Sequence, residues 1–385
     1  MQTEKKTQLQ DRFMANDMIM VATIAFGMGI DKPNIRNIIN FDIPASVEAY
    51  SQQIGRAGRD GKPSICAFYL CPEDLYLRDI FTYGEQPSAN SLRRLVKDIC
   101  SPANARLDVG DTITVDRYNQ SKEFDIKAIA LSILYAHLEL ELGLFRATTP
   151  KYSNYTYQTH SPHFIQADKS PVAMAVKTAV FKKGPKWSHV DVDAAAAVPG
   201  IVRADVLQKL NEWGESGAIE LKTGGVRHVY RLLRKLPSTS EEIGGIVKKL
   251  YSYMQAREQQ DLGRTKDVIG LISSESCISR RLAAYFGDGS EGMPAECGHC
   301  VWCETHTQVS MPEMPPASPD PALVDKVLTA CHARDDPRFL ARVAFGIVSP
   351  RVTAMRLGRD PVFGSMNVCD FMELVRVFTD ICEGS

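Results

Sequence analysis

The segment spanning residues 19–61 constrains the fold of this chain more than any other. Four apolar residues at 19–22 predict a buried strand of a parallel sheet. Residues 23–31 are rich in glycine and small side chains, as expected where a backbone passes close to a phosphate. The pattern then predicts strands over 37–41 and 65–70, a helix over 45–54, and an amphipathic helix over 1–16. An α/β fold is therefore predicted for the start of the chain.

The segment ends in Gly55-Arg56-Ala57-Gly58-Arg59-Asp60-Gly61, here named the arginine loop. It carries two guanidinium groups three residues apart, separated by small residues. Each guanidinium offers a planar fork of donors that matches anionic oxygens. A solvated basic turn would be the simpler interpretation of an isolated arginine pair, but it does not account for the pattern of the whole segment.

Taken together, the strings ATIAFGMGIDKPN and QQIGRAGRDG resemble motifs V and VI of RecQ-type helicases of superfamily 2. The resemblance implies the second of two RecA-like lobes, facing an ATP that is held mainly by the first lobe. It implies an arginine finger, which stabilises charge on the transferring phosphoryl group. The implied site residues are Arg59 as the finger, Arg56 and Gln52 beside it, Gly29 and Asp31 at the nucleotide cleft, and Thr23 near the DNA strand.

A helicase of this class also needs a GxxxxGK[ST] phosphate loop and a DExH acid pair, and neither string occurs in the 385 residues. We therefore expect the C-terminal part of a RecQ-type ATP-dependent 3′-5′ DNA helicase without its first lobe or the start of its second. ATP and Mg²⁺ should bind only when a first motor lobe is supplied elsewhere, and the chain alone should be inactive as an ATPase. The alternative is a non-catalytic fragment that binds DNA or a partner.

The net charge of −1 predicts no global attraction to nucleic acid, so contacts with single-stranded or forked DNA must come from local patches. The N-terminus is polar, and no apolar run approaches the roughly 20 residues of a membrane span. Neither a signal peptide nor a membrane partner is expected. The helicase resemblance implies DNA repair or recombination in the nucleus.

The middle of the chain, residues 124–236, has a winged-helix-like pattern of helices followed by short strands. Tyr152, Tyr155 and Tyr157 are candidates for stacking on unpaired bases, although cross-strand tyrosines of an ordinary hairpin are equally consistent with the pattern. Strands over 217–222 and 226–232 predict a hairpin that turns at Thr223-Gly224-Gly225. The candidates for phosphate contacts on this hairpin, against the alternative of a solvated polar face, are Lys222, Arg227 and Arg231.

Four of the ten cysteines, Cys277, Cys297, Cys300 and Cys303, have the spacing C-x19-C-x2-C-x2-C. Four thiolates at such spacing complete a closed tetrahedral site, which favours structural Zn²⁺ over a catalytic metal. The segment also resembles the zinc motif of RecQ helicases, including its Arg-Arg and Tyr-Phe-Gly elements. Unlike the usual RecQ order, the winged-helix-like region precedes the zinc motif here.

The predicted fold is a partial RecA-like helicase C-terminal lobe of the α/β class, followed by mainly α winged-helix-like and zinc-binding modules. Residues 341–350, with the later Phe363-Gly364 and Asp370-Phe371, resemble the C-terminal region of the Rothmund–Thomson branch of RecQ helicases. The predicted domains are the partial lobe (1–87), a helical connector (88–123), the winged-helix-like region (124–236), the helical zinc module (237–305), a Pro-rich linker (306–321) and a helical C-terminal domain (322–385).

Overall fold

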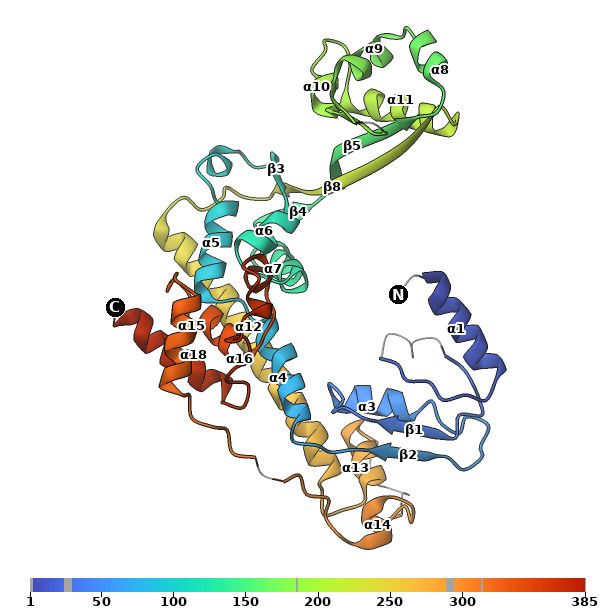
Figure 1. Ribbon diagram of the computed structural model, residues 1–385, viewed down its shortest axis with the longest axis vertical. Coiled ribbons are helices and arrows are strands. Elements are labelled where there is room, and N and C mark those ends of the chain that lie inside the picture. The colour runs from blue at the N-terminus through green and yellow to red at the C-terminus, as the bar shows by residue number, and fades with distance from the viewer. Residues whose placement is uncertain (1–2, 24–29, 185, 289–293, 313, 385) are drawn as a thin grey trace. The chain divides into compact units, whose positions relative to one another are not determined.

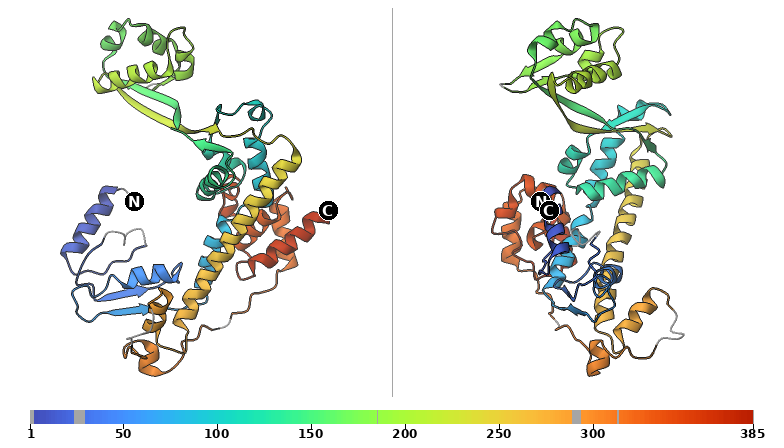
Figure 2. Two further views of the ribbon diagram at one scale, coloured as in Figure 1. Left: turned by 180° about the vertical axis from the view of Figure 1, so that it is seen from behind. Right: turned by 90° about the vertical axis from the view of Figure 1, so that its right-hand side faces the viewer.

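The computed structural model describes residues 3–23, 30–184, 186–288, 294–312 and 314–384 (Figures 1 and 2). The chain divides into two compact units, and the division falls within two helices. Unit 1 comprises residues 1–90 and 251–385, and unit 2 comprises residues 91–250. Every helix in the described residues is too short or too polar to cross a membrane.

Unit 1 begins with the βαβ arrangement that the sequence predicts. Helix α1 spans Thr3–Ala15, and strand β1 spans Asn37–Asn40. Helix α3 (Val47–Ile54) connects β1 to the parallel strand β2 (Ile65–Phe68), with Asn37 opposite Ile65. The Ser46 side chain caps α3 by accepting a hydrogen bond from the Ala49 N–H, which satisfies one of the free donors at the helix start.

The strand predicted over residues 19–22 is wrong. These residues lie outside helices and strands, and the side chains of Ile19 and Val21 are 92% and 94% exposed. A strand exists only where its backbone pairs with a neighbour, and β1 pairs with β2 alone in the described residues. An apolar run by itself does not supply that neighbour.

The long helix α12 spans Ser240–Ile272. Gly263 lies inside it, where glycine costs about 1 kcal/mol relative to alanine. The C-terminal end of α12 packs on α3 in a core that includes Val47, Tyr50 and Leu271. Two short helices of the cysteine-rich segment follow, α13 (Ile278–Tyr285) and α14 (Val301–Thr305).

The C-terminal helices of unit 1 share a core with α4 (Asp74–Glu85). Tyr83 of α4 stacks on Phe371 with ring centroids 4.5 Å apart, and the Tyr76 hydroxyl donates to the Phe345 carbonyl at 3.0 Å. These contacts fix the C-terminal segment to the helix that follows β2. The C-terminal elements are α15 (Pro321–Ala330), α16 (Pro337–Phe345), α17 (Pro350–Ala354), the 3-10 turn η2 (Leu357–Arg359) and α18 (Phe371–Glu383).

Unit 2 is built around a six-stranded sheet with the order β3-β8-β5-β7-β6, in which β4 also pairs with β8. Strands β5 and β8 run side by side as an antiparallel ribbon, and helices α8–α11 gather at one end of it (Figure 1). The helices are α5 (Ala89–Ile99), α6 (Arg117–Glu123), α7 (Ala128–Leu140), α8 (Pro162–Ala167), α9 (Pro171–Thr178), α10 (Val192–Ala196) and α11 (Arg203–Glu215), with a 3-10 turn η1 (Asn104–Arg106). The strands are β3 (Thr112–Val115), β4 (Phe145–Ala147), β5 (Lys151–Thr159), β6 (Val180–Lys183), β7 (Ser188–Val190) and β8 (Ile219–Leu232).

The hairpin predicted to turn at Thr223-Gly224-Gly225 is wrong, because β8 continues through these residues as one strand of 14. Gly225 has a positive φ of 64°, and a Cβ added there would collide with the Ser153 side chain of β5. Glycine is therefore required here for the close approach of a neighbouring strand rather than for a turn.

Two of the three candidate stacking tyrosines lie in the core instead of on the surface. Tyr155 and Tyr157 are 5% and 6% exposed and pack with Trp213 and Val206 of α11. In a strand, alternate side chains point to the same face, so both rings follow the buried face of β5. Tyr152 is 42% exposed and remains the single member of the set that a base can reach.

Candidate functional site

The arginine loop is folded against the residues that follow the glycine-rich segment. The Gly58 N–H donates to the Ile35 carbonyl at 3.0 Å, and the Asp60 N–H donates to the Pro33 carbonyl at 3.2 Å. Gly58 has a φ of 61°, and a Cβ there would lie 2.7 Å from Ser64 Oγ. The loop therefore depends on glycine at this position, since other residues rarely adopt this backbone conformation.

Arg36, which the sequence analysis missed, is the main side chain that holds this loop. Its guanidinium forms an ion pair with Asp60 at 2.5 Å and donates to the carbonyls of Lys62 and Pro63, both at 3.1 Å. The hydrogen bond from Arg36 lowers the pKa of the Asp60 carboxyl. The available signal was an arginine immediately before a predicted strand, which by itself is not specific.

Arg59 and Asp31, two of the predicted site residues, lie together. Arg59 Nη1 is 2.6 Å from Asp31 Oδ1, and Arg59 Nε donates to the Gly55 carbonyl at 3.2 Å. The two side chains are 40% and 82% exposed, so the ion pair contributes little stability and its guanidinium is accessible to another anion. A guanidinium has the same donor geometry for a carboxylate as for a phosphate oxygen.

The other residues predicted around the nucleotide are placed less specifically. Gln52 is exposed in the last turn of α3, and Arg56 is partly buried just beyond that helix. Thr23 is exposed and outside helices and strands. Gly29 lies outside the described residues, so the structure shows nothing of it.

A buried lysine fastens the segment after Asp31 to the first helix. Lys32 is 7% exposed, and its ammonium donates to the carbonyls of Asn16 at 3.1 Å and Met14 at 3.5 Å. The ammonium also lies 5.6 Å from the centroid of the Phe13 ring. These contacts connect the end of α1 to the residues on which the arginine loop is folded.

The four spaced cysteines converge as the sequence predicts. The sulfur atoms of Cys277, Cys297, Cys300 and Cys303 all lie within 4.8 Å of one another, close enough to bind one metal ion. Cys277 and Cys300 are the N-cap residues of α13 and α14, and Gly298 adopts a φ of 73° in the tight turn between ligands. The site therefore combines two helix starts with one turn, and its donor set of four thiols suits a soft, tetrahedral metal.

Hydrogen bonds lower the pKa of one of these thiols. Burial raises the pKa of Cys297, but hydrogen bonds from the Ser279 side chain and the His299 backbone outweigh it and bring that pKa to about 6. Burial raises the pKa of Cys303 to about 12. Metal binding displaces the protons of all four thiols, so affinity for the ion should fall in acid.

The cysteine-rich segment packs directly on the helix that leads into the arginine loop. Ile278 and Leu282 of α13 contact the core formed by α3 and the end of α12. The Tyr285 hydroxyl donates to Glu48 Oε1 on α3 at 2.8 Å. A metal at the four cysteines would thus stabilise the surroundings of α3.

The three basic residues predicted on β8 do not form one cluster. Lys222 lies 3.2 Å from Glu220, and its ammonium is 4.1 Å from the centroid of the Trp187 ring. Arg227 forms an ion pair with Asp116, whereas Arg231 is exposed four residues further along the strand. Only Arg227 and Arg231 share a face, because side chains alternate between the faces of a strand and these two residues are four apart.

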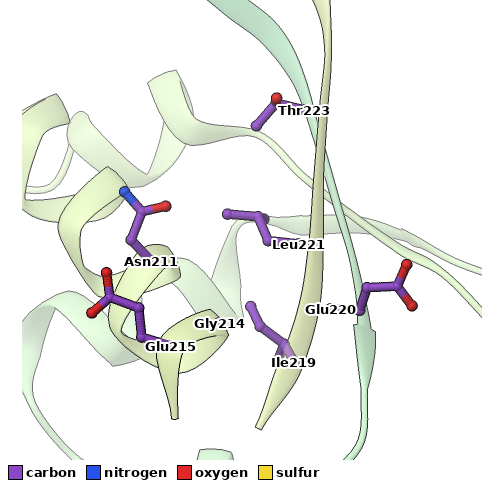
Figure 3. A pocket seen from close by; sticks show the side chains of 7 residues that line it. All are labelled: Asn211, Gly214, Glu215, Ile219, Glu220, Leu221 and Thr223. Atoms are coloured by element: carbon purple, nitrogen blue, oxygen red, sulfur yellow. The ribbon is translucent and has the colours of Figure 1, made fainter. Parts of the chain in front are cut away.

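A hollow of about 580 Å³ lies between α11 and β8 (Figure 3). Its lining includes Asn211 and Glu215 from the helix and Glu220 and Leu221 from the strand. Figure 3 shows Asn211 and Glu215 on the helix side and Leu221 and Thr223 on the strand side. Glu220 points away from the helix in Figure 3, so Glu215 is the carboxylate on the helix side of the hollow.

Comparison with known proteins identifies the first part of the chain. Residues 1–61 match the family described as helicase conserved C-terminal domain. The chain is 27% identical over 235 residues to ATP-dependent DNA helicase Q-like 5 of Arabidopsis thaliana, covering 60% of this chain and 25% of that protein.

Shorter matches with higher identity follow the same pattern. ATP-dependent DNA helicase Q4 of Mus musculus is 38% identical over 105 residues, which is 26% of this chain and 9% of that protein. The probable ATP-dependent DNA helicase RecS of Bacillus subtilis is 40% identical over 90 residues, 23% of this chain and 18% of that protein. The chain thus spans a quarter or less of the length of each of these relatives.

Proposed function

We propose, from the premise that this chain carries a RecQ-type helicase C-terminal region, that it works as part of an ATP-dependent 3′-5′ DNA helicase. Its setting in this proposal is DNA repair or recombination in the nucleus, within the Rothmund–Thomson branch. The names of the relatives support action on DNA, and the resemblance of residues 341–350, Phe363-Gly364 and Asp370-Phe371 supports the branch.

The observation that carries this proposal is the arrangement of the arginine loop. Arg36, Pro33 and Ile35 hold the loop in shape, and Arg59 rests on an exposed carboxylate that a phosphate can replace. In this proposal Arg59 stabilises charge on the transferring phosphoryl group, while Arg56 and Gln52 couple the nucleotide to closure of the two lobes. Asp31 and Gly29 line the nucleotide side, and Thr23 lies toward the DNA strand.

The four-cysteine site is proposed to hold structural Zn²⁺. Four cysteine ligands leave no open coordination position for substrate, which is the property of structural rather than catalytic zinc sites. The packing of α13 on α3 gives this ion a second role, since losing it would loosen the helix that positions the arginine loop.

The alternative is a non-catalytic chain that binds DNA or a protein partner. The lack of a GxxxxGK[ST] string in the 385 residues favours it for this chain by itself. Under the helicase proposal, ATP and Mg²⁺ are held by a first lobe, and Arg59 completes the site. The two proposals differ in whether Arg59 affects ATP hydrolysis once such a lobe is present.

Binding of DNA is the first test, and it uses the chain as it is. Fluorescence anisotropy with labelled forked and single-stranded oligonucleotides at 50 mM salt should show binding that is insensitive to base sequence. Affinity should fall as salt rises, because phosphate contacts release counterions. Failure to bind either oligonucleotide at 50 mM salt would contradict the proposed function.

A further inference from the structure

Two pairs of like charges face each other across the strands of unit 2. In the register of the sheet, Lys151 of β5 is directly opposite Arg227 of β8, and Arg146 of β4 is directly opposite Arg231. Directly opposed residues of an antiparallel pair project from the same face of a sheet. Because residues 227 and 231 are four apart on one strand, all four side chains belong to one face.

This face, here named the cationic face, is defined by Arg146, Lys151, Arg227 and Arg231. Like charges directly opposite each other destabilise a sheet by up to about 1 kcal/mol per pair. The ordinary solution is to place an acid or a neutral residue opposite a cation. Two such pairs in succession on the same face are therefore not explained by the stability of the sheet.

The nearby carboxylates neutralise the cationic face only in part. Asp116 forms an ion pair with Arg227, and Glu139 of α7 lies 3.3 Å from Arg146 Nε. Within the residues described in unit 2, Lys151 and Arg231 have no ion-pair partner. Four cations against two carboxylates leave an excess of two positive charges.

The groups around these cations suit phosphates rather than bases. The Arg146 side chain is 67% exposed, and Arg231 is also exposed. On the other edge of β8, Thr112 lies opposite Arg231 and Thr114 opposite Val229, which adds two exposed hydroxyl groups to the face. Hydroxyl and guanidinium groups donate to phosphate oxygens, and this set contains no aromatic ring on which a base would stack.

We propose that the cationic face binds the phosphate backbone of DNA, with Arg146 and Lys151 as contacts that the sequence analysis did not assign. The inference rests on the proposed action of the chain on DNA. The two like-charge pairs are separated along β8 by roughly 13 Å, at about 3.3 Å per residue. Phosphates placed between and beside the opposed cations remove the repulsion that the sheet otherwise bears.

The test compares salt dependence in charge-neutralised variants of the whole chain. Arg146→Gln combined with Arg231→Gln removes both cations of one like-charge pair and leaves Lys151 and Arg227 in place. For forked DNA between 50 and 200 mM salt, the slope of log affinity against log salt should fall by about two units, at roughly 0.9 per phosphate contact. The thermal midpoint should change little, because the change removes the repulsion between the two arginines together with the ion pair of the exposed Arg146 with Glu139, and such a pair contributes little stability.

A matched control tests whether the position of the removed charges matters, rather than their number. Arg93→Gln with Lys97→Gln removes two exposed cations from α5 of the same unit, and it should leave the slope near that of the parent. Glu139→Gln removes one of the two neutralising carboxylates and should increase both the affinity and the slope.

Each result has a definite meaning. A parental slope in the Arg146 and Arg231 double variant, or an equal loss in the α5 control, would overturn the inference while leaving DNA binding by the chain established. Absence of binding by the parent would overturn the proposed function and the inference with it.

Discussion

The buried ion pair between Arg338 of α16 and Glu258 of α12 allows a sharp test of how unit 1 is held together. The side chains are 7% and 5% exposed. Arg338 also donates to the Tyr83 carbonyl of α4 at 3.2 Å, and its guanidinium lies 5.2 Å from the centroid of the Phe371 ring. One guanidinium thus connects four helices of the unit.

Removing either partner alone should be costly, because it leaves the other charge buried without compensation. The expected loss is about 3–5 kcal/mol for Glu258→Gln, since Arg338 does not lose its proton. A unit of this size changes its thermal midpoint by roughly 2–4 °C per kcal/mol, so the midpoint should fall by about 10 °C. Replacing both residues, with Glu258→Leu and Arg338→Met, should restore most of the stability.

The Arg338→Met variant should depend on pH in a specific direction. Burial raises the pKa of the Glu258 carboxyl in the parent, and Arg338 opposes that shift. Without the guanidinium the folded pKa should rise further, so the folded state binds a proton that the unfolded state releases. Stability should therefore increase as pH falls from 8 to 5, and be lost as pH rises through the folded pKa.

Differential scanning calorimetry of the parent, the two single variants and the double variant measures these differences. A midpoint for Glu258→Gln within 2 °C of the parent would refute the reasoning. An Arg338→Met variant that loses stability as pH falls from 8 to 5 would also refute it. The parent, measured over the same pH range, controls for the other titrating groups.

Two further changes test the loop and the metal site. Gly58→Ala places a methyl group against Ser64 and the Lys62 carbonyl on a left-handed backbone, and should destabilise unit 1 by about 1–3 kcal/mol. A urea-unfolding midpoint equal to the parent's would argue against the described loop. Cys300→Ser should remove a bound metal, whose binding contributes on the order of 10 kcal/mol of folding free energy in small modules. Metal analysis of the parent that finds no zinc under reducing conditions would contradict the zinc proposal.

Local sequence patterns were sufficient where they determine the local structure. The β1-α3-β2 arrangement follows from short apolar runs around a helix with a Ser46 cap. The convergence of four cysteines follows from their spacing, since two of them are adjacent to a tight turn. In both cases the residues that specify the structure are close together in the chain.

The wrong predictions have a common physical reason: the structure at these residues depends on partners that are distant in the chain. Residues 19–22 resemble a strand but have no paired neighbour in the described residues. Gly225 resembles a turn residue, whereas it accommodates Ser153 from a strand more than 70 positions away. Arg36 and Lys32 donate hydrogen bonds to backbone carbonyls, and no sequence pattern predicts these partners.

Arg59 is proposed to complete an ATP site formed with a first lobe. The direct measurement is DNA-stimulated ATP hydrolysis by a fusion in which an ATP-binding RecQ-type lobe precedes this chain. Arg59→Ala should lower the rate by about 10³-fold or more, as for other arginine fingers, while the exposed Arg359→Ala control keeps the parental rate. A fusion carrying Arg59→Ala that hydrolyses ATP as fast as its parent would contradict the account.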